Sequence, residues 1–386
     1  MKEILIDANG AGKRLDKFLF RYLSGAPKSL IYAQLRKKNI NLNRKKAEGS
    51  EILTEGDTLQ CFFSDETWEK FINPALREND GTDDPADENN GSARALVKQC
   101  KNCYRAHPEV RVLYEDEDIL LLDKPAGLLT QRARKEDESL GDWLLGYLFE
   151  EKNLDPKSLA VFRPSICHRL DRNTSGIVIC AGTLRAAQKT AVLLKEHRIG
   201  KYYLAVVYGH LQDGHTVTGI LEKNESNNTV KIRTTAQDRY EDEEGRRDPR
   251  RIVTSYIPVS YDEETDTTLL LARLVTGKTH QLRAQFASLG HPIVGDPKYG
   301  AGYTGNERRS VHAKSQLLHS CYTVFPEDAD DREGWMTAAG QAFFCSPDNP
   351  VWGRFLKGLT ASSIRELIDS NRELFGDLTQ TIGGSK

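Results

Sequence analysis

Several features that would assign this chain to a specialised class of protein are missing from its 386 residues. No stretch approaches the run of about eighteen apolar residues that a membrane-spanning helix needs, so we expect no membrane partner. The start of the chain lacks an apolar core followed by a small-residue cleavage site, so we expect no secretory signal. The seven cysteines are scattered and odd in number. This favours reduced thiols in the cytoplasm over a disulfide framework.

A glycine-rich nucleotide-binding loop is also missing, and the net charge of −2 is unusual for a nucleic-acid-binding protein. The charge is unevenly distributed, however. Residues 1–63 hold 12 Lys and Arg against 7 Asp and Glu, whereas residues 64–92 hold 2 against 9. Phosphates respond to the local field rather than to the sum of charges. The chain therefore combines a basic module with an acidic segment.

The length and the changes in composition predict three segments. Residues 1–63 form a small basic domain, residues 64–108 an acidic flexible linker, and residues 109–386 the main domain. The linker is rich in Gly, Pro and Asn and has few apolar residues, so it cannot bury enough surface to offset its ordering entropy. Cys100 and Cys103 lie near its end. No second pair follows to complete four zinc ligands, so we interpret them as incidental thiols.

Strands outnumber helices after residue 109, and they often follow one another directly. This pattern predicts an α+β fold built on a mixed, mostly antiparallel sheet rather than a doubly wound fold. The polar stretch 223–250 is expected to form a loop or a β excursion from that sheet. We find no internal repeat in the sequence.

The first module carries two clusters of cations. A predicted helix ends in Arg36, Lys37 and Lys38, and a second cluster at 43–46 follows a short strand. Cations at a helix C-terminus are explained by the helix dipole alone. The pattern over residues 13–63, however, resembles the alpha-L RNA-binding motif. That resemblance implies a small α/β domain whose cations contact folded RNA.

The first cluster of the main domain whose residues could perform chemistry is "HRLDRNTSG", residues 168–176. Asp171 lies between Arg169 and Arg172, just ahead of a buried strand. A carboxylate flanked by cations stays ionised, which suits a nucleophile or a base rather than a general acid. The arginines offer permanent donors to phosphates or base edges. The alternative is a cluster of ion pairs that only holds a loop in place.

The second cluster, residues 201–205, places Tyr202 and Tyr203 side by side in a predicted strand. Neighbours in a strand face opposite ways, so one tyrosine can pack in the core while the other lines a cleft. A tyrosine in a cleft can stack on a nucleobase. The alternative is that both rings are structural.

The third cluster, residues 276–283, is a turn that enters a helix. Helix N-termini bind anions, which brings Lys278 and His280 into consideration. Arg283 lies beside the apolar face of this helix and is expected to be partly buried. A partly buried arginine needs a carboxylate, and Asp171 is the candidate. The alternative is a capping turn with a surface arginine.

Taken together, the motifs closely resemble the RluA-type pseudouridine synthases over about residues 109–326. They are "HRLDRNTSGIVICAGT", "KYYLAVVYG" and "TGKTHQLRAQFASLGHPIVGDPKYG", preceded by "LYEDEDILLLDKPAGLLT". The N-terminal module extends the likeness to the RluC and RluD type. The resemblance implies a pseudouridine synthase fold and isomerisation of uridine in structured RNA, above all large-subunit (23S) ribosomal RNA. It also implies that no cofactor or metal is needed.

The resemblance assigns a role to individual residues. Asp171 is the nucleophile, Arg169 takes the place of the flipped base, Tyr203 stacks on the uracil, and Arg283 pairs with Asp171. Lys278 stands where the family usually has arginine, so any contact there lacks a bidentate fork. The remaining residues that we expect to bind RNA are His168, Arg172, Lys201, Lys278, His280, Arg36, Lys37 and Lys38.

Three alternatives remain open at this point. The chain could be a non-catalytic RNA-binding ribosome-assembly factor on the same fold, because a fold does not grant an activity. It could be a tRNA pseudouridine synthase, or a hydrolase with an aspartate nucleophile. A pure binder has no reason to retain Asp171, which repels phosphate, and the hydrolase lacks an evident second carboxylate. We expect a cytoplasmic monomer with RNA as its partner.

Overall fold

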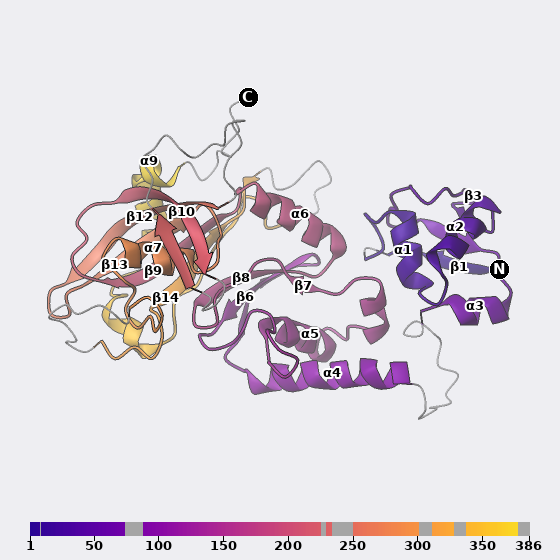
Figure 1. Cartoon of the computed structure of the whole chain (residues 1–386), viewed down its shortest axis with the longest axis horizontal. Helices are drawn as coiled ribbons and strands as arrows, with labels where there is room; N and C mark the ends of the chain where they lie inside the picture. Colours follow the sequence, from indigo (N-terminus) through magenta and orange to yellow (C-terminus); the bar gives the residue numbers. More distant parts are fainter. Residues whose placement is uncertain are drawn as a thin grey trace.

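The computed structural model describes residues 1–7, 9–73, 88–224, 229–233, 250–300, 311–327 and 337–376. A small N-terminal module and a larger main domain lie side by side (Figure 1). Among the described residues, no helix has the length and apolar character needed to cross a bilayer.

The N-terminal module is a four-stranded sheet covered by helices. Its strands follow the order β1-β4-β2-β3, and neighbouring strands are antiparallel. The apolar side chains of α1 and α2 pack onto the sheet and exclude water from a continuous core. The elements are β1 (Lys2–Leu5), α1 (Leu15–Tyr22), α2 (Lys28–Arg36), β2 (Ile40–Leu42), β3 (Lys45–Lys46), β4 (Thr58–Cys61) and α3 (Asp65–Phe71).

The predicted linker over residues 64–108 is wrong at both of its ends. At its start, Trp68 and Phe71 of α3 are buried in the core of the N-terminal module. At its end, α4 (Glu88–Ala106) packs along α5 (Leu140–Glu151). Apolar residues at the two ends bury enough surface to order both helices, and the acidic composition of the whole stretch concealed them. Residues 74–87 lie outside the described part of the chain.

Cys100 and Cys103 are core residues of this helix pair. Both thiols are buried at the α4–α5 contact, Cys103 beside Trp143 and Cys100 beside Leu145 and Phe149. Burial raises the pKa of Cys100 to about 11 and that of Cys103 to about 12, so both remain protonated at neutral pH.

The main domain is built on one large sheet. Eleven strands belong to it, and its main path runs β11-β10-β12-β13-β9-β14-β8-β6-β5. The described pairings are antiparallel except for the parallel pair β14–β8, which confirms the mixed, mostly antiparallel α+β fold. The strands are β5 (Arg111–Glu115), β6 (Ile119–Lys124), β7 (Ser165–Ile166), β8 (Ser175–Ala181), β9 (Gly200–Tyr208), β10 (His215–Asn224), β11 (Thr229–Arg233), β12 (Arg251–Asp262), β13 (Thr267–Leu274), β14 (Leu318–Val324) and β15 (Ala342–Phe344). The polar stretch 223–250 therefore contributes to the β10–β11 hairpin, and residues 234–249 lie outside the described part.

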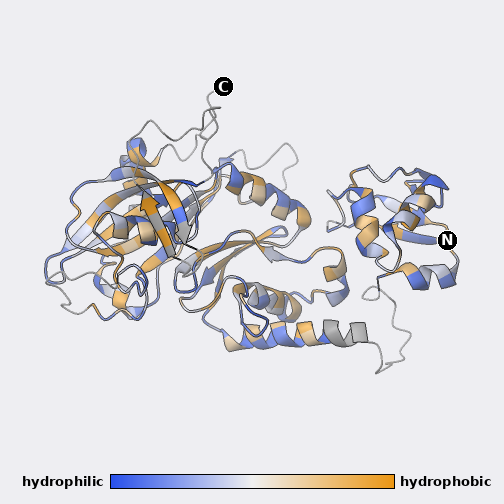
Figure 2. Cartoon of the chain, viewed as in Figure 1, coloured by the Kyte–Doolittle hydropathy of each residue, from blue (hydrophilic) through white to orange (hydrophobic). Residues whose placement is uncertain are grey.

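Helices cover both faces of this sheet, and hydrophobic colours run along its central strands (Figure 2). On one face α5 and α7 (Gln281–Ser288) pack against the strands. On the other face lie α6 (Leu184–Lys195), α8 (Ala361–Ser370) and α9 (Arg372–Phe375). Short 3-10 turns occupy Pro156–Ala160 and Pro350–Arg354.

The N-terminal module contacts the main domain at Val161. Lys13 Nζ and Arg21 NH1 both donate to Val161 O, the latter at 3.2 Å. Val161 also packs against the core of the module. Two donors on a single acceptor fix this contact at the end of the 156–160 turn.

Candidate active site

Asp171 lies in the loop between β7 and β8. Thr130 fastens this loop, because its hydroxyl donates to Leu170 O at 2.7 Å and accepts from Leu170 N at 3.1 Å. At the end of the loop, Gly176 has a φ of 108° and faces Ser320 across the parallel strand pair. A Cβ there would lie 2.2 Å from Ser320 O, so only glycine allows this close approach.

Lys124 supports the same loop from beneath, and the sequence reasoning did not identify it. Its Nζ lies 2.8 Å from Pro125 O, 2.8 Å from Leu128 O and 2.9 Å from Arg172 O. A neutral amine has only two N–H donors, so three acceptors require the ammonium form. Burial lowers the pKa of Lys124 to about 7, while the nearby Asp171 and Asp123 oppose that shift. The sequence signal for Lys124 was its position in the "LLDKPAG" stretch, which belongs to the first segment of the family resemblance.

The carboxylate of Asp171 pairs with Arg283 of α7. Arg283 NH1 lies 2.9 Å from Asp171 Oδ2, and the Asp171 side chain keeps 24% exposure while that of Arg283 keeps 8%. This confirms the contact expected from the sequence. Arg169 and Arg172 are not the ion-pair partners of Asp171 in the described structure. The cation comes from α7, which is distant in sequence and adjacent in space.

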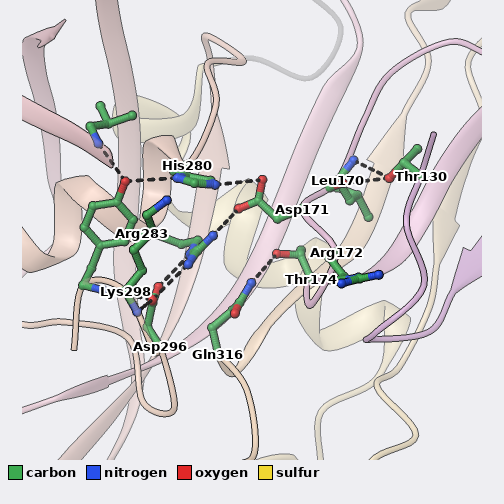
Figure 3. Close-up of polar contacts among 12 residues, drawn as sticks. Thr130, Leu170, Asp171, Arg172, Thr174, His280, Arg283, Asp296, Lys298 and Gln316 are labelled. Atoms are coloured by element: carbon green, nitrogen blue, oxygen red, sulfur yellow. Dashed lines mark hydrogen bonds and ion pairs between the residues drawn. The ribbon is translucent and has the colours of Figure 1, made fainter. Parts of the chain in front are cut away.

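Arg283 is held on its other side by Asp296, a second residue that the sequence reasoning missed. Arg283 Nε and NH2 donate to the two Asp296 oxygens at 2.7 and 3.0 Å (Figure 3). Asp296 also accepts from Lys298 N and Tyr299 N. Burial alone would raise the pKa of Asp296, but these hydrogen bonds outweigh it and lower the pKa. Asp296 is therefore an ionised anchor for the guanidinium.

His280 completes this group of polar side chains. Its backbone is left-handed, with a φ of 54°, at the start of α7. Its Nε2 lies 3.9 Å from Asp171 Oδ1, and its Nδ1 lies 3.0 Å from Tyr299 Oη. Burial lowers the pKa of His280, although Asp171 opposes the shift. The Arg283 guanidinium also lies over the Tyr299 ring at 5.3 Å.

Tyr203 faces the Asp171 side of the sheet. It lines one small cavity with Asp171, Arg283 and Arg169, whereas Tyr202 packs on the opposite face against Phe375. This alternation confirms the expected division between the two rings. Burial raises the pKa of Tyr203, so the phenol is protonated at neutral pH. The cavity measures about 60 Å³, room for only a few water molecules.

The other residues expected to bind RNA occupy three different environments. The side chain of Arg169 is exposed at the rim of the cavity, and that of Arg172 is exposed and points away from Asp171 (Figure 3). His168 Nε2 accepts from Ile179 N at 3.1 Å. This requires a neutral ring and agrees with a pKa that burial lowers to about 3. The His168 ring is therefore neutral, so it cannot contact RNA as a cation.

The remaining cations lie farther from Asp171. Lys201 and Lys278 line a second cavity next to the first, and Lys278 lines both. Arg36, Lys37 and Lys38 are exposed at the end of α2, in the N-terminal module.

One group of described residues has the composition of a metal site. The ligand atoms of Cys103, His107 and Glu138 lie within 4.8 Å of one another. His107 is already engaged, however, because its two ring nitrogens each lie 3.0 Å from a carboxylate oxygen, of Glu109 and of Glu138. The thiol of Cys103 is protonated and contacts Ser139 O. An imidazolium between two carboxylates accounts for this geometry without an ion.

Comparison with known proteins gives a consistent result. A family model described as RNA pseudouridylate synthase matches residues 118–288. A Mycoplasma genitalium protein named as an uncharacterized RNA pseudouridine synthase is 28% identical over 329 residues, which cover 84% of this chain and 89% of that protein. The ribosomal large subunit pseudouridine synthase C of Vibrio cholerae is 29% identical over 327 residues, covering 81% and 88%. The ribosomal large subunit pseudouridine synthase D of Xanthomonas campestris is 33% identical over 225 residues, covering 54% and 62%.

Proposed function

The chain belongs to the RluA-type family of RNA pseudouridylate synthases, which isomerise uridine to pseudouridine in RNA, and on this premise we propose that it modifies large-subunit ribosomal RNA with Asp171 as its nucleophile. The names of the bacterial relatives support the ribosomal target. The observation that carries the nucleophile is the half-buried Asp171 carboxylate, fixed by Arg283 beside the ring of Tyr203.

The reaction needs the target base outside the helix. A stacked uridine cannot be turned over in place, so it is extruded into a pocket. Asp171 attacks at the sugar C1′ or acts through a route that passes a glycal. The uracil then detaches, rotates and rejoins the sugar through C5, and the C5 proton leaves. On the attack route the bond between Asp171 and C1′ forms as the N1–C1′ bond breaks, and it breaks again when C5 bonds to C1′. N1 gains one proton and C5 loses one, so the product is an isomer of the substrate and no oxidant or reductant is needed.

Arg283 positions the nucleophile in this scheme. Its guanidinium is fixed by two hydrogen bonds to Asp296, so the third N–H defines where the Asp171 oxygen lies. A carboxylate held in one orientation needs less reorganisation before it attacks. The other Asp171 oxygen is the one nearer to His280.

Tyr203 supplies the surface against which the uracil lies. Its ring can stack on the base, and its hydroxyl can relay the C5 proton by accepting it while passing its own proton on to solvent. Because the cavity measures only about 60 Å³, entry of the base requires movement at the rim. Arg169 lies exposed at that rim, so it is free to leave the mouth and take the position that the base vacates in the RNA stack.

We assign RNA binding to the N-terminal module as well. Arg36, Lys37 and Lys38 at the end of α2 and the cations of the β2–β3 turn are exposed on either side of β2. Exposed cations on a small rigid module suit contacts with phosphates. The core of this module includes α3, so its boundary lies beyond residue 63.

A non-catalytic RNA-binding protein is the competing function. The buried ion-pair chain of Asp171, Arg283 and Asp296 argues against it, because a carboxylate at the centre of an RNA site repels phosphate. A cytoplasmic location accords with free thiols at every described cysteine.

Mapping of pseudouridine tests the proposal. Large-subunit ribosomal RNA from cells with the gene, without it, and with Asp171→Asn is treated with carbodiimide and read by primer extension. We expect one or more stops that are present only with the intact gene. Identical maps in the three strains would refute the ribosomal target.

A further inference from the structure

A second and much larger cavity adjoins the Asp171 cavity. It measures about 720 Å³ and lies where the end of α6 approaches the starts of β9 and β12. The turn at residues 276–278 forms the side facing Asp171, and Lys278 lines both cavities. A chain of nucleotides that reaches Asp171 therefore has room beside it.

Lys201 is the notable side chain in this cavity. It is half-buried, and among the described residues its Nζ has neither a hydrogen-bond nor an ion-pair partner. Lys124, the other lysine buried near the loop, has three carbonyl partners. An ammonium group that loses water without gaining a partner is costly. Burial lowers the pKa of Lys201 to about 8 for the same reason. An anion in the cavity would remove this cost.

The register of β9 relates Lys201 to the uracil site. Lys201 and Tyr203 are two residues apart in the same strand, so their side chains leave the same face of the sheet about 7 Å from each other. A nucleotide whose base lies against Tyr203 continues into a backbone that passes the rim shared by the two cavities. Lys201 then lies on the same face of the sheet as that backbone.

The other charged residues of the cavity favour an anion. Lys195, His197, Arg251 and Lys278 line it together with Lys201. Among the described residues that line the cavity the acid is Glu196, and its carboxylate pairs with Arg198 at 3.5 Å. The apolar part of the lining, which includes Val253, suits the sugar and base of a nucleotide rather than a bare ion.

We propose that this cavity binds the RNA strand beside the extruded uridine, with Lys201 as the ligand of one phosphodiester group. The proposal rests on the proposed function and adds to it the position of the neighbouring nucleotide. In this arrangement Lys201 contributes to RNA affinity and to the placement of the strand, while Asp171 performs the chemistry.

The test compares Lys201→Met with Lys201→Arg, and with Lys357→Met as a matched loss of one exposed lysine outside the cavity. Binding of an unmodified large-subunit ribosomal RNA transcript is measured at several salt concentrations, together with single-turnover isomerisation at saturating RNA. We expect Lys201→Met to weaken binding about tenfold and to reduce the salt slope by about 0.7 to 0.9. Lys201→Arg should retain most of the affinity, and Lys357→Met should bind and isomerise the transcript like the wild type.

Thermal unfolding of the same variants shows whether the fold is intact. Lys201→Met is expected to melt at or above the wild-type temperature, because it removes a half-buried charge that has no partner among the described residues. If it does not fold, the Arg variant and protection of Lys201 from an amine reagent by the transcript decide the question. Unchanged affinity and salt slope in Lys201→Met, or no protection by RNA, would overturn the proposal.

Two further comparisons distinguish failure of the cavity proposal from failure of the proposed function. Inorganic phosphate binding that needs Lys201, with RNA binding unaffected, would indicate a site for a free anion and overturn the proposal. Wild-type protein that isomerises the transcript while Lys201→Met binds it equally well overturns the cavity inference alone. If the wild type isomerises no RNA, the proposed function fails, and the binding comparison still decides whether the cavity holds RNA.

Discussion

Asp171 and Asp296 bind the same guanidinium, that of Arg283, through different N–H groups. One carboxylate is fully buried and the other is partly exposed to the cavity. The buried carboxylate thus fixes the position of the arginine, and the arginine fixes the carboxylate that we propose as the nucleophile.

The first prediction follows from this chain of contacts. Asp296→Asn removes the charge that compensates the buried arginine and leaves Arg283 with one carboxylate. Breaking a buried ion pair costs about 3–5 kcal/mol of unfolding free energy. Urea denaturation should show this loss, and kcat should fall at least tenfold because Asp171 is no longer held. Full activity in a protein destabilised as expected would show that the anchor does not act on Asp171.

The second prediction concerns the phenol of Tyr203. Tyr203→Phe retains the ring and its stacking, so KM should change less than threefold. It loses the hydroxyl that we propose for removal of the C5 proton, so kcat should fall about a hundredfold or more. Tyr202→Phe on the opposite face is the control and should keep wild-type kinetics, because its ring packs in the core away from the cavity. A Tyr203→Phe protein with wild-type kcat would limit this residue to stacking.

The third prediction concerns the cations of α2. Replacing Arg36, Lys37 and Lys38 together by alanine should weaken RNA binding and reduce the dependence of affinity on salt. Because the wild type loses more affinity as salt rises, the difference between the proteins should be largest at low salt. The charge-conserving variant Arg36→Lys, Lys37→Arg, Lys38→Arg should bind like the wild type. Equal salt slopes for the alanine and wild-type proteins would exclude this cluster from the RNA interface.

The fourth prediction concerns the contact that holds the end of α4. Burial opposes protonation of His107, but its hydrogen bonds with Glu109 and Glu138 outweigh burial and raise its pKa. A raised pKa in the folded state stabilises the fold fully below the unfolded value near 6.5, and this contribution is lost as the pH rises through the folded pKa. His107→Gln should therefore melt below the wild type at about pH 5.5, and the gap should close at alkaline pH. A gap independent of pH would mean that His107 acts only by packing.

Features of the site that follow from local chemistry could be predicted from the sequence. Alternation along a strand predicted that Tyr202 and Tyr203 would face opposite sides. The electrostatic cost of a buried arginine predicted that Arg283 would contact Asp171, over a separation of 112 residues. Both predictions need only a periodicity or a charge balance, which the sequence carries directly.

The features that were missed depend on the three-dimensional fold. Asp296 competes for the same arginine, but nothing in the sequence shows which carboxylate reaches a buried cation. Lys124 acts by donating to backbone carbonyls, including that of Arg172, and carbonyls leave no mark in a sequence. α4 is ordered because apolar residues such as Cys100 pack against α5. These residues are few, so the average composition of the segment remains acidic and polar.

The central claim is that Asp171 is the nucleophile that frees a uracil from its sugar. It is tested most directly with purified protein and a ribosomal RNA transcript labelled with tritium at C5 of uridine, because isomerisation releases that hydrogen to water. We predict release by the wild type and none by Asp171→Asn, although the variant binds the transcript with comparable affinity. Release by Asp171→Asn at a rate close to that of the wild type would contradict the claim.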